Sequence, residues 1–224
     1  MSHVIDYSPE QVDQKLRDLN ALSLALQFIT TASGQQALRL RLMQGCVIGE
    51  DGLVYRDGKV VTKGNAQYRT WASDNGGELV GDWPLPQGMT AKDVGANAVA
   101  VVEMTPEAKA EYKKMNAYDQ PYEVGVIPRL NPETGEMTYS LTHDFFNGGN
   151  GLEKYIGETK VKYPPGGGPA KVEEAHGQLM MFYQMAAAKM QADAVGIDIE
   201  YEKLEDGSYK AKVDKRTEAH KVLA

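Results

Sequence analysis

Two histidines are the side chains in this sequence that best fit a metal site. His143 is followed directly by Asp144, and His176 comes shortly after Glu173 and Glu174. The His-Asp pair falls on a predicted strand, where neighbouring side chains point to opposite faces and cannot bind one ion together. A site made of His143, His176 and one of the two glutamates requires the long helix near the C-terminus to pack over that strand. The alternative is that these histidines are hydrogen-bonded structural residues.

A glycine-rich segment supplies a second candidate site, for phosphate. Gly166, Gly167 and Gly168 are followed by Lys171, at the start of a helix predicted over residues 170–195. Free amides at a helix N-terminus can hold an anion. However, the segment lacks the Gly-Lys-Ser/Thr ending of a P-loop, and no strand leads directly into it. The pattern therefore favours a flexible hinge, with phosphate binding as the alternative.

The only cysteine, Cys46, excludes an intramolecular disulfide and any metal site made of several cysteines. It stands at the start of an apolar run, and no histidine lies near it in the sequence. We interpret it as a buried thiol that packs as a small hydrophobic side chain, with a reactive nucleophile as the alternative. This cysteine usage also favours a reducing compartment.

Flexible thioethers and large aromatic rings are the side chains that best suit a protein-binding surface. Thioether groups repack readily against different partners, and aromatic residues anchor interfaces. The same aromatic residues can instead hold their loops against the core, and the sequence leaves both roles open. The candidates are Met180, Met181 and Met185 on the predicted long helix, and Trp71, Trp83 and Phe146 in glycine-rich loops.

The elements that must position these residues follow from the hydrophobic periodicity. A helix over residues 9–29 begins with the capping signal Ser8-Pro9. The remaining predicted elements are a strand over 38–42, small hairpins between 49 and 86, a buried strand over 98–104, a helix over 106–115, a hairpin of 122–127 and 137–145, a helix over 170–195, and a closing hairpin of 197–201 and 209–213. This order predicts one α+β domain over residues 1–224, with a mainly antiparallel sheet, two principal helices packed on one face and a β-rich insertion.

Several short stretches together resemble one family. They are the Met-Ser-His start, the helix over 9–29, Ala98–Val102, Tyr122–Val126 with Thr138–Leu141, the tyrosine-bearing helix and Glu205–Tyr209. The chain resembles the small conserved family of unknown function that is encoded in red-algal plastids and cyanobacteria and carried by many bacteriophages. The match covers residues 1–30 and 97–213 as a pattern, without a single diagnostic motif. It implies an antiparallel sheet with two helices on one face, and no catalytic residue comes with it.

The chain departs from this family in length. Family members have little more than half as many residues, so the resemblance implies an insertion over residues 31–97. The flexible segment rich in glycine and proline, at about residues 147–169, is also longer than usual. Phage copies of cellular genes commonly carry such additions, so a phage origin is the resulting expectation.

The balance of charge argues against nucleic-acid and membrane partners. The chain has 24 Lys and Arg against 31 Asp and Glu, a formal net charge of -7 that repels phosphate backbones and anionic membranes. It contains no apolar run of about eighteen residues, the length that a membrane helix needs, and no signal peptide. We expect a cytoplasmic protein, in the host cytoplasm if the gene belongs to a phage.

These observations lead to three hypotheses about function. The first is a non-catalytic accessory protein that acts through contacts with an unidentified protein partner and needs no cofactor. The second is a small metal-dependent or phosphate-handling enzyme that uses His143 and His176. The third is a structural component of a virion, and a homo-oligomer is compatible with the first and the third.

Overall fold

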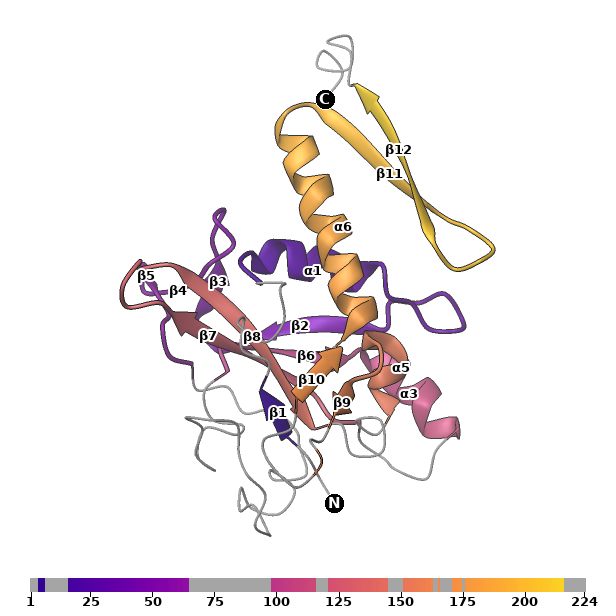
Figure 1. Ribbon diagram of the computed structural model, residues 1–224, viewed down its shortest axis with the longest axis horizontal. Coiled ribbons are helices and arrows are strands. Elements are labelled where there is room, and N and C mark those ends of the chain that lie inside the picture. The colour runs from indigo at the N-terminus through magenta and orange to yellow at the C-terminus, as the bar shows by residue number, and fades with distance from the viewer. Residues whose placement is uncertain are drawn as a thin grey trace.

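The computed structural model describes residues 4–6, 16–64, 98–115, 121–144, 151–162, 165, 171–174 and 176–215. Its centre is a five-stranded sheet with the strand order β1-β8-β7-β6-β2 (Figure 1). These strands are β1 (Val4–Asp6), β2 (Leu38–Leu42), β6 (Ala100–Met104), β7 (Val124–Leu130) and β8 (Met137–Asp144). All pairings within this sheet are antiparallel.

Three smaller antiparallel sheets and four helices make up the rest of the described chain. The small sheets are β3 (Cys46–Ile48) with β4 (Val54–Arg56) and β5 (Lys59–Val60), β9 (Lys160–Lys162) with β10 (Lys171–Glu174), and β11 (Ile197–Lys203) with β12 (Tyr209–Lys215). The helices are α1 (Leu19–Gln27), α3 (Pro106–Met115), α5 (Glu153–Ile156) and α6 (Gly177–Ala194). The predicted α+β class with mainly antiparallel sheets is confirmed.

The two faces of the central sheet differ in polarity. Along β2 the leucines alternate with Arg39 and Arg41, so that leucines and arginines occupy opposite faces. The helices α1 and α6 pack against each other, and α1 also packs along β2. Leu22 and Leu26 of α1 and Phe182 of α6 belong to the same buried cluster as the apolar residues of the sheet. These two helices and the sheet therefore share one hydrophobic core.

The second face of β8 carries small polar side chains that are also buried. Thr138, Ser140 and Thr142 alternate with the apolar residues of this strand, and all three are almost fully shielded from solvent. Ser140 accepts a hydrogen bond from Arg129 Nε on β7 at 3.1 Å. Burial lowers the pKa of Arg129. A strand was predicted over these residues, but the burial of its polar side chains was not.

The helix α1 begins later than the periodicity predicts. Residues 7–15 lie outside the described part of the chain, and Leu16 forms an extended bridge to Tyr139 rather than a helical turn. The helix starts at Leu19, because the carboxylate of Asp18 accepts hydrogen bonds from the amides of Asn20 and Ala21 at 2.7 and 3.2 Å. This side chain satisfies two amides that the helix itself leaves without an acceptor.

Asp18→Ala should lower the free energy of unfolding by about 1 kcal/mol, the usual loss for an N-cap replaced by alanine. Asp18→Asn is the matched control, because its amide oxygen can still accept from the same two backbone groups. Urea denaturation of both variants measures the difference. An equal loss in the two variants would show that the charge of Asp18, and not its capping bonds, stabilises the helix.

The helix α6 also begins later than predicted. Residues 171–174 form β10, which pairs antiparallel with β9, so the helix starts at Gly177 and not near residue 170. The N-cap residue is His176, whose positive φ of 50° interrupts any helical continuation toward β10. The end of the helix agrees with prediction, because Gly196 has a φ of +74° and a left-handed conformation there.

The range predicted to be an insertion contributes to the main fold. β2 lies within residues 31–97 and forms the edge of the central sheet beside β6. The strands β4 and β5 form one of the expected small hairpins, and positive φ angles at Asp57 and Gly58 make the turn between them. The strand β3, which pairs with β4, lies before the range predicted for these hairpins. Cys46 is buried, as predicted, and burial raises the pKa of its thiol. Residues 65–97 lie outside the described part of the chain.

Candidate functional site

The predicted metal ligands are not brought together within the described side chains. His143 lies on β8 opposite Ile5 of β1, as the strand prediction required, but its side chain and those of Glu173 and Glu174 are outside the described set. His176 is buried at the start of α6. Among the described residues, no group of three or more His, Cys, Asp or Glu side chains has an arrangement that could hold a metal. A site made of His143 and His176 stays a prediction.

The glycine-rich candidate for phosphate lies mostly outside the described chain as well. Gly166, Gly167 and Gly168 fall in that part, and the backbone of Lys171 begins β10. Because α6 begins at Gly177, the free amides at its N-terminus are separated from Lys171 by the rest of β10. The correction to the helix start removes the direct link between these glycines and a helix N-terminus.

The predicted partner-binding residues differ in exposure. Trp71, Trp83 and Phe146 lie outside the described part of the chain. Met180 is 6% exposed and belongs to the core, whereas Met181 is 36% exposed on the outer side of α6. Met185 is half-buried. Of the three predicted methionines, Met181 is the one that α6 presents at the surface.

The described part of α6 and the β11–β12 hairpin form a unit that we call the C-terminal arm (residues 177–215). Figure 1 shows this arm projecting beyond the central sheet, with the hairpin lying beside the helix. The hydroxyl of Tyr201 donates to the carbonyl of Met185 at 2.9 Å, and Lys189 donates to the carbonyl of Ile199 at 3.0 Å. These bonds hold β11 against α6, which leaves β12 as the outer strand.

Aromatic rings hold the β11–β12 hairpin against its neighbours. The ring centroids of Phe182 and Tyr209 lie 5.4 Å apart in an edge-to-face arrangement, and those of Phe28 and Tyr201 lie 6.2 Å apart. Such pairs add about 0.5 to 1.5 kcal/mol beyond the area that they bury. The hairpin is therefore tied both to α6 and to the residue that ends α1.

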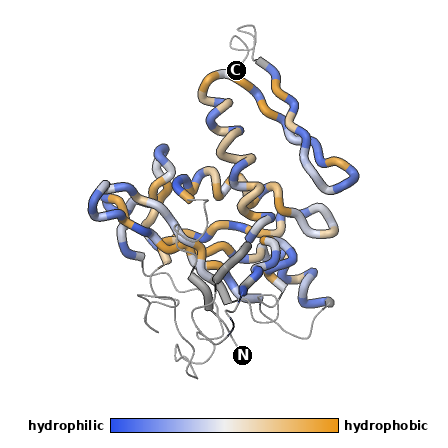
Figure 2. The backbone as a smooth tube through the Cα atoms, viewed as in Figure 1, coloured by the Kyte–Doolittle hydropathy of each residue, from blue (hydrophilic) through white to orange (hydrophobic). Residues whose placement is uncertain are grey.

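Four of the six large apolar side chains that are exposed among the described residues belong to the arm. Val195, Leu204 and Val213 are 72%, 40% and 60% exposed, and they lie before β11, after β11 and within β12, respectively. The residues from Lys210 to Asp214 are all exposed. Figure 2 shows hydrophobic and hydrophilic residues alternating along the hairpin. Charged residues thus alternate with the apolar ones along the hairpin.

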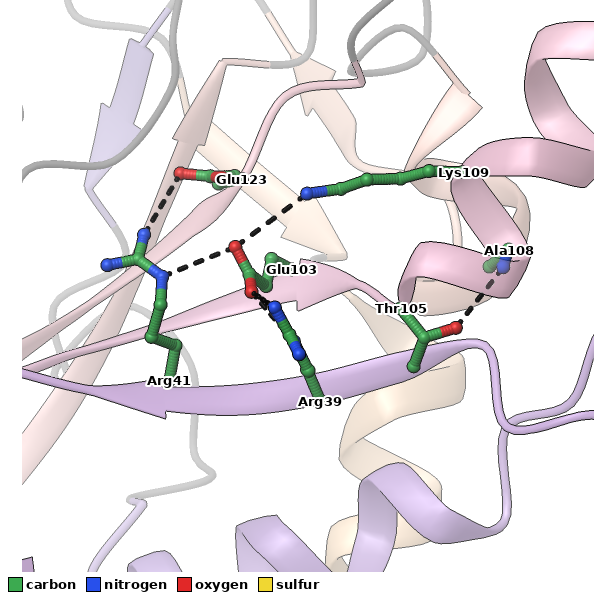
Figure 3. Close-up of polar contacts among 7 residues, drawn as sticks. All are labelled: Arg39, Arg41, Glu103, Thr105, Ala108, Lys109 and Glu123. Atoms are coloured by element: carbon green, nitrogen blue, oxygen red, sulfur yellow. Dashed lines mark hydrogen bonds and ion pairs between the residues drawn. The ribbon is translucent and has the colours of Figure 1, made fainter.

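A charged cluster lies at the edge of the central sheet (Figure 3). The side chain of Glu103 on β6 is only 6% exposed, and it binds Arg39 at 2.5 Å and Arg41 at 3.3 Å on the neighbouring strand β2. Lys109 of α3 lies 3.8 Å from the same carboxylate. Arg41 also lies 3.6 Å from Glu123. One buried carboxylate therefore joins β6, β2 and α3.

The charge state of Glu103 follows from these contacts. Burial by itself raises the pKa of a carboxylic acid, but here the hydrogen bond from Arg39 and the charges of Lys109, Arg39 and Arg41 outweigh it. The pKa of Glu103 is therefore lowered, and the group is ionised at neutral pH. The three cations keep a substantial part of their side chains in contact with water. We interpret the cluster as a structural junction that neutralises a buried charge.

Sequence reasoning missed this junction, although a signal was present. Glu103 is the one charged residue in the predicted strand over residues 98–104. A charged side chain within a buried strand requires a partner, because charged residues are almost never fully buried unless paired. Arg39 and Arg41 were available on another predicted strand. The missing information was that these two strands are neighbours.

Comparisons with protein-family models, curated proteins and solved structures give no match for this chain. The resemblance to the plastid, cyanobacterial and phage family stays a prediction from the sequence. None of the helices within the described ranges has both the length and the apolar character that are needed to cross a bilayer.

Proposed function

We propose that this protein is a non-catalytic cytoplasmic accessory factor that works through protein–protein contacts made by its C-terminal arm. The observation that supports this proposal is the exposure of Val195, Leu204 and Val213 on a unit that projects from the body. Phage origin, as the sequence resemblance implies, is part of the same proposal.

The position of these apolar residues matters more than their number. Single exposed apolar side chains are ordinary on protein surfaces and need no explanation. Here Val213 lies on β12 directly opposite Ile199, on the same sheet face that β11 turns toward α6. A two-stranded hairpin is marginally stable alone, and a partner that covers the exposed part of Val213 would bury additional apolar surface.

Replacing two of these residues should remove partner binding without unfolding the chain. We expect Val195→Ser/Val213→Ser to reduce the amount of protein captured by the tagged full chain by about tenfold or more, because few interface residues supply most of the affinity. The measurement is quantitative affinity capture from a lysate of cells that carry the gene, followed by mass spectrometry. Untagged copies of the chain are counted among the captured proteins.

The chain offers a matched control for this experiment. Val47 and Leu130 are 62% and 49% exposed and lie on β3 and β7, away from the arm. Val47→Ser/Leu130→Ser should leave capture unchanged. Equal loss in both double variants, or no loss in either, would contradict a specific role of the arm.

A further inference from the structure

We infer that the arm binds a second copy of this chain, and that the two copies join through antiparallel pairing of β12 with β12 about a two-fold axis. This inference rests on the proposed function and names its partner. It is carried by the outer edge of β12, which has no neighbouring strand among the described residues, together with the charges along that edge.

The outer edge of β12 has no strand beside it among the described residues, where β11 and β12 form a two-stranded sheet. An unpaired edge presents backbone amides and carbonyls that another strand can bind. The other strand of the hairpin, β11, is the one held against α6 through Tyr201 and Lys189. β12 is therefore the strand better placed to accept an additional neighbour.

Two charged residues of β12 lack partners within the described part of the chain. Lys210 lies opposite Glu202 in the hairpin, but the carboxylate of Glu202 binds Lys212 instead, at 2.8 Å. Asp214 lies opposite Asp198, whose carboxylate binds Lys189 at 3.1 Å. Like charges that face each other across a strand pair are destabilising. The single hairpin thus leaves one cation and one anion of β12 unused.

A two-fold axis through the middle of β12 brings these unused charges together. Residues that face each other in an antiparallel pair lie on the same side of the sheet. With Lys212 at the axis, Lys210 of each copy faces Asp214 of the other, so two opposite-charge pairs form. Ala211 then faces Val213 twice, which extends the apolar side of the hairpin across both copies. Lys212 meets itself, but its charge is already paired with Glu202.

The alternative pairings of the hairpin edges are less consistent with these charges. Pairing β11 with β11 about its centre would place Asp198 opposite Glu202 in both halves of the interface, which is repulsive. Pairing β11 with β12 in a head-to-tail manner would leave a free edge on each end, so growth would not stop at two copies. The β12–β12 arrangement forms two opposite-charge pairs between Lys210 and Asp214 and closes as a dimer.

Sedimentation equilibrium of the full chain over a concentration series tests this inference. An interface of this small size belongs to the weak class, so association should depend visibly on concentration. We expect a monomer–dimer equilibrium for the natural chain. Asp214→Lys should weaken dimerisation by about tenfold or more, because two attractive contacts become Lys–Lys contacts. Lys210→Glu/Asp214→Lys exchanges the two charges and should restore the dimer.

The design separates an interface role from a structural one. Within a single hairpin, Asp214→Lys replaces a facing pair of acids by Lys opposite Asp198, so the stability of the monomer should stay equal or rise while dimerisation falls. Glu205→Lys, at the exposed turn of the hairpin, makes the same change in net charge away from the β12 edge and should leave the dimer intact.

Several outcomes would overturn the inference. They are a natural chain that stays monomeric at every concentration, a chain that assembles beyond a dimer, and equal effects of Asp214→Lys and Glu205→Lys. A monomeric chain whose arm still captures another protein would remove this inference alone. Arm variants that change neither self-association nor capture would remove the proposed function as well.

Discussion

Glu103→Ala is expected to lower the free energy of unfolding at pH 7 by about 2 to 3 kcal/mol. Removing one member of a fully buried ion pair typically destabilises a protein by about 3 to 5 kcal/mol, because the remaining charge stays buried and unpaired. Here the carboxylate is buried, but Arg39 and Arg41 are about half exposed and can be hydrated when Glu103 is lost. The expected loss is therefore below the fully buried range.

The loss should depend on pH in a direction that the lowered pKa of Glu103 fixes. A carboxyl group whose pKa is lower in the folded than in the unfolded chain stabilises the fold at pH values above the ordinary value of 4.5. That contribution falls as the pH drops through the lowered pKa of the folded state. Glu103→Gln should thus be destabilising at pH 7 and equal to the natural chain in strong acid.

Urea denaturation at a series of pH values measures this dependence. Glu136→Gln is the matched control, because Glu136 forms an exposed ion pair with Arg17 at 2.9 Å and exposed pairs contribute about 0 to 1 kcal/mol. A difference between Glu103→Gln and the natural chain that persists unchanged into strong acid would show that packing, and not the charge of Glu103, stabilises the junction.

The parts of the fold that were predictable are those where local chemistry and tertiary structure agree. The alternating Leu and Arg residues of β2 specify a strand with two different faces, and the strand is there. The helix predicted over residues 106–115 is present as α3, and the hydroxyl of Thr105 before it accepts from the amide of Ala108 at 3.2 Å. The turn residues Gly196 and Gly207 both have positive φ angles. In each case the residues that determine the structure are close together in the sequence.

The parts that were not predictable depend on partners far away in the sequence. Leu16 fits the helical period of residues 9–29, but its carbonyl accepts from the amide of Tyr139 at 2.8 Å, which favours an extended conformation there. In the same way, Lys171–Glu174 fits a helix start and instead pairs with Lys160–Lys162. Periodicity cannot reveal such pairing, because it describes one segment at a time.

The candidate interface was only partly visible in the sequence. The closing hairpin of residues 197–201 and 209–213 was predicted, and it is present with longer strands. The charges of β12 can be interpreted only with the strand register, which places Asp214 opposite Asp198 and Lys210 opposite Glu202. The methionines of the predicted long helix were the more obvious candidates for partner binding, but the fold buries Met180 and leaves Met181 exposed.

Tyr139→Ala should be the most destabilising of the changes considered, with a loss of about 4 kcal/mol in the free energy of unfolding. Tyr139 is almost fully buried on β8, and removing its ring leaves a cavity, for which large-to-small aromatic changes give about 3 to 5 kcal/mol. Its hydroxyl also accepts from the amide of Val54 on β4 at 3.0 Å. One side chain thus joins the central sheet to the β3–β5 sheet.

Tyr139→Phe separates the two contributions of this side chain, because it keeps the ring and removes the hydroxyl. Val54 is fully buried, so its amide would lose its acceptor where water cannot replace it, and a loss of about 1 to 3 kcal/mol is expected. Tyr201→Phe is the control, since the Tyr201 hydroxyl binds Met185 at a half-buried position where water can substitute. Urea denaturation should therefore rank the losses as Tyr139→Ala, then Tyr139→Phe, then Tyr201→Phe. Equal losses for the two Phe variants would mean that the Val54 amide finds another acceptor, and that the ring of Tyr139 alone holds the two sheets together.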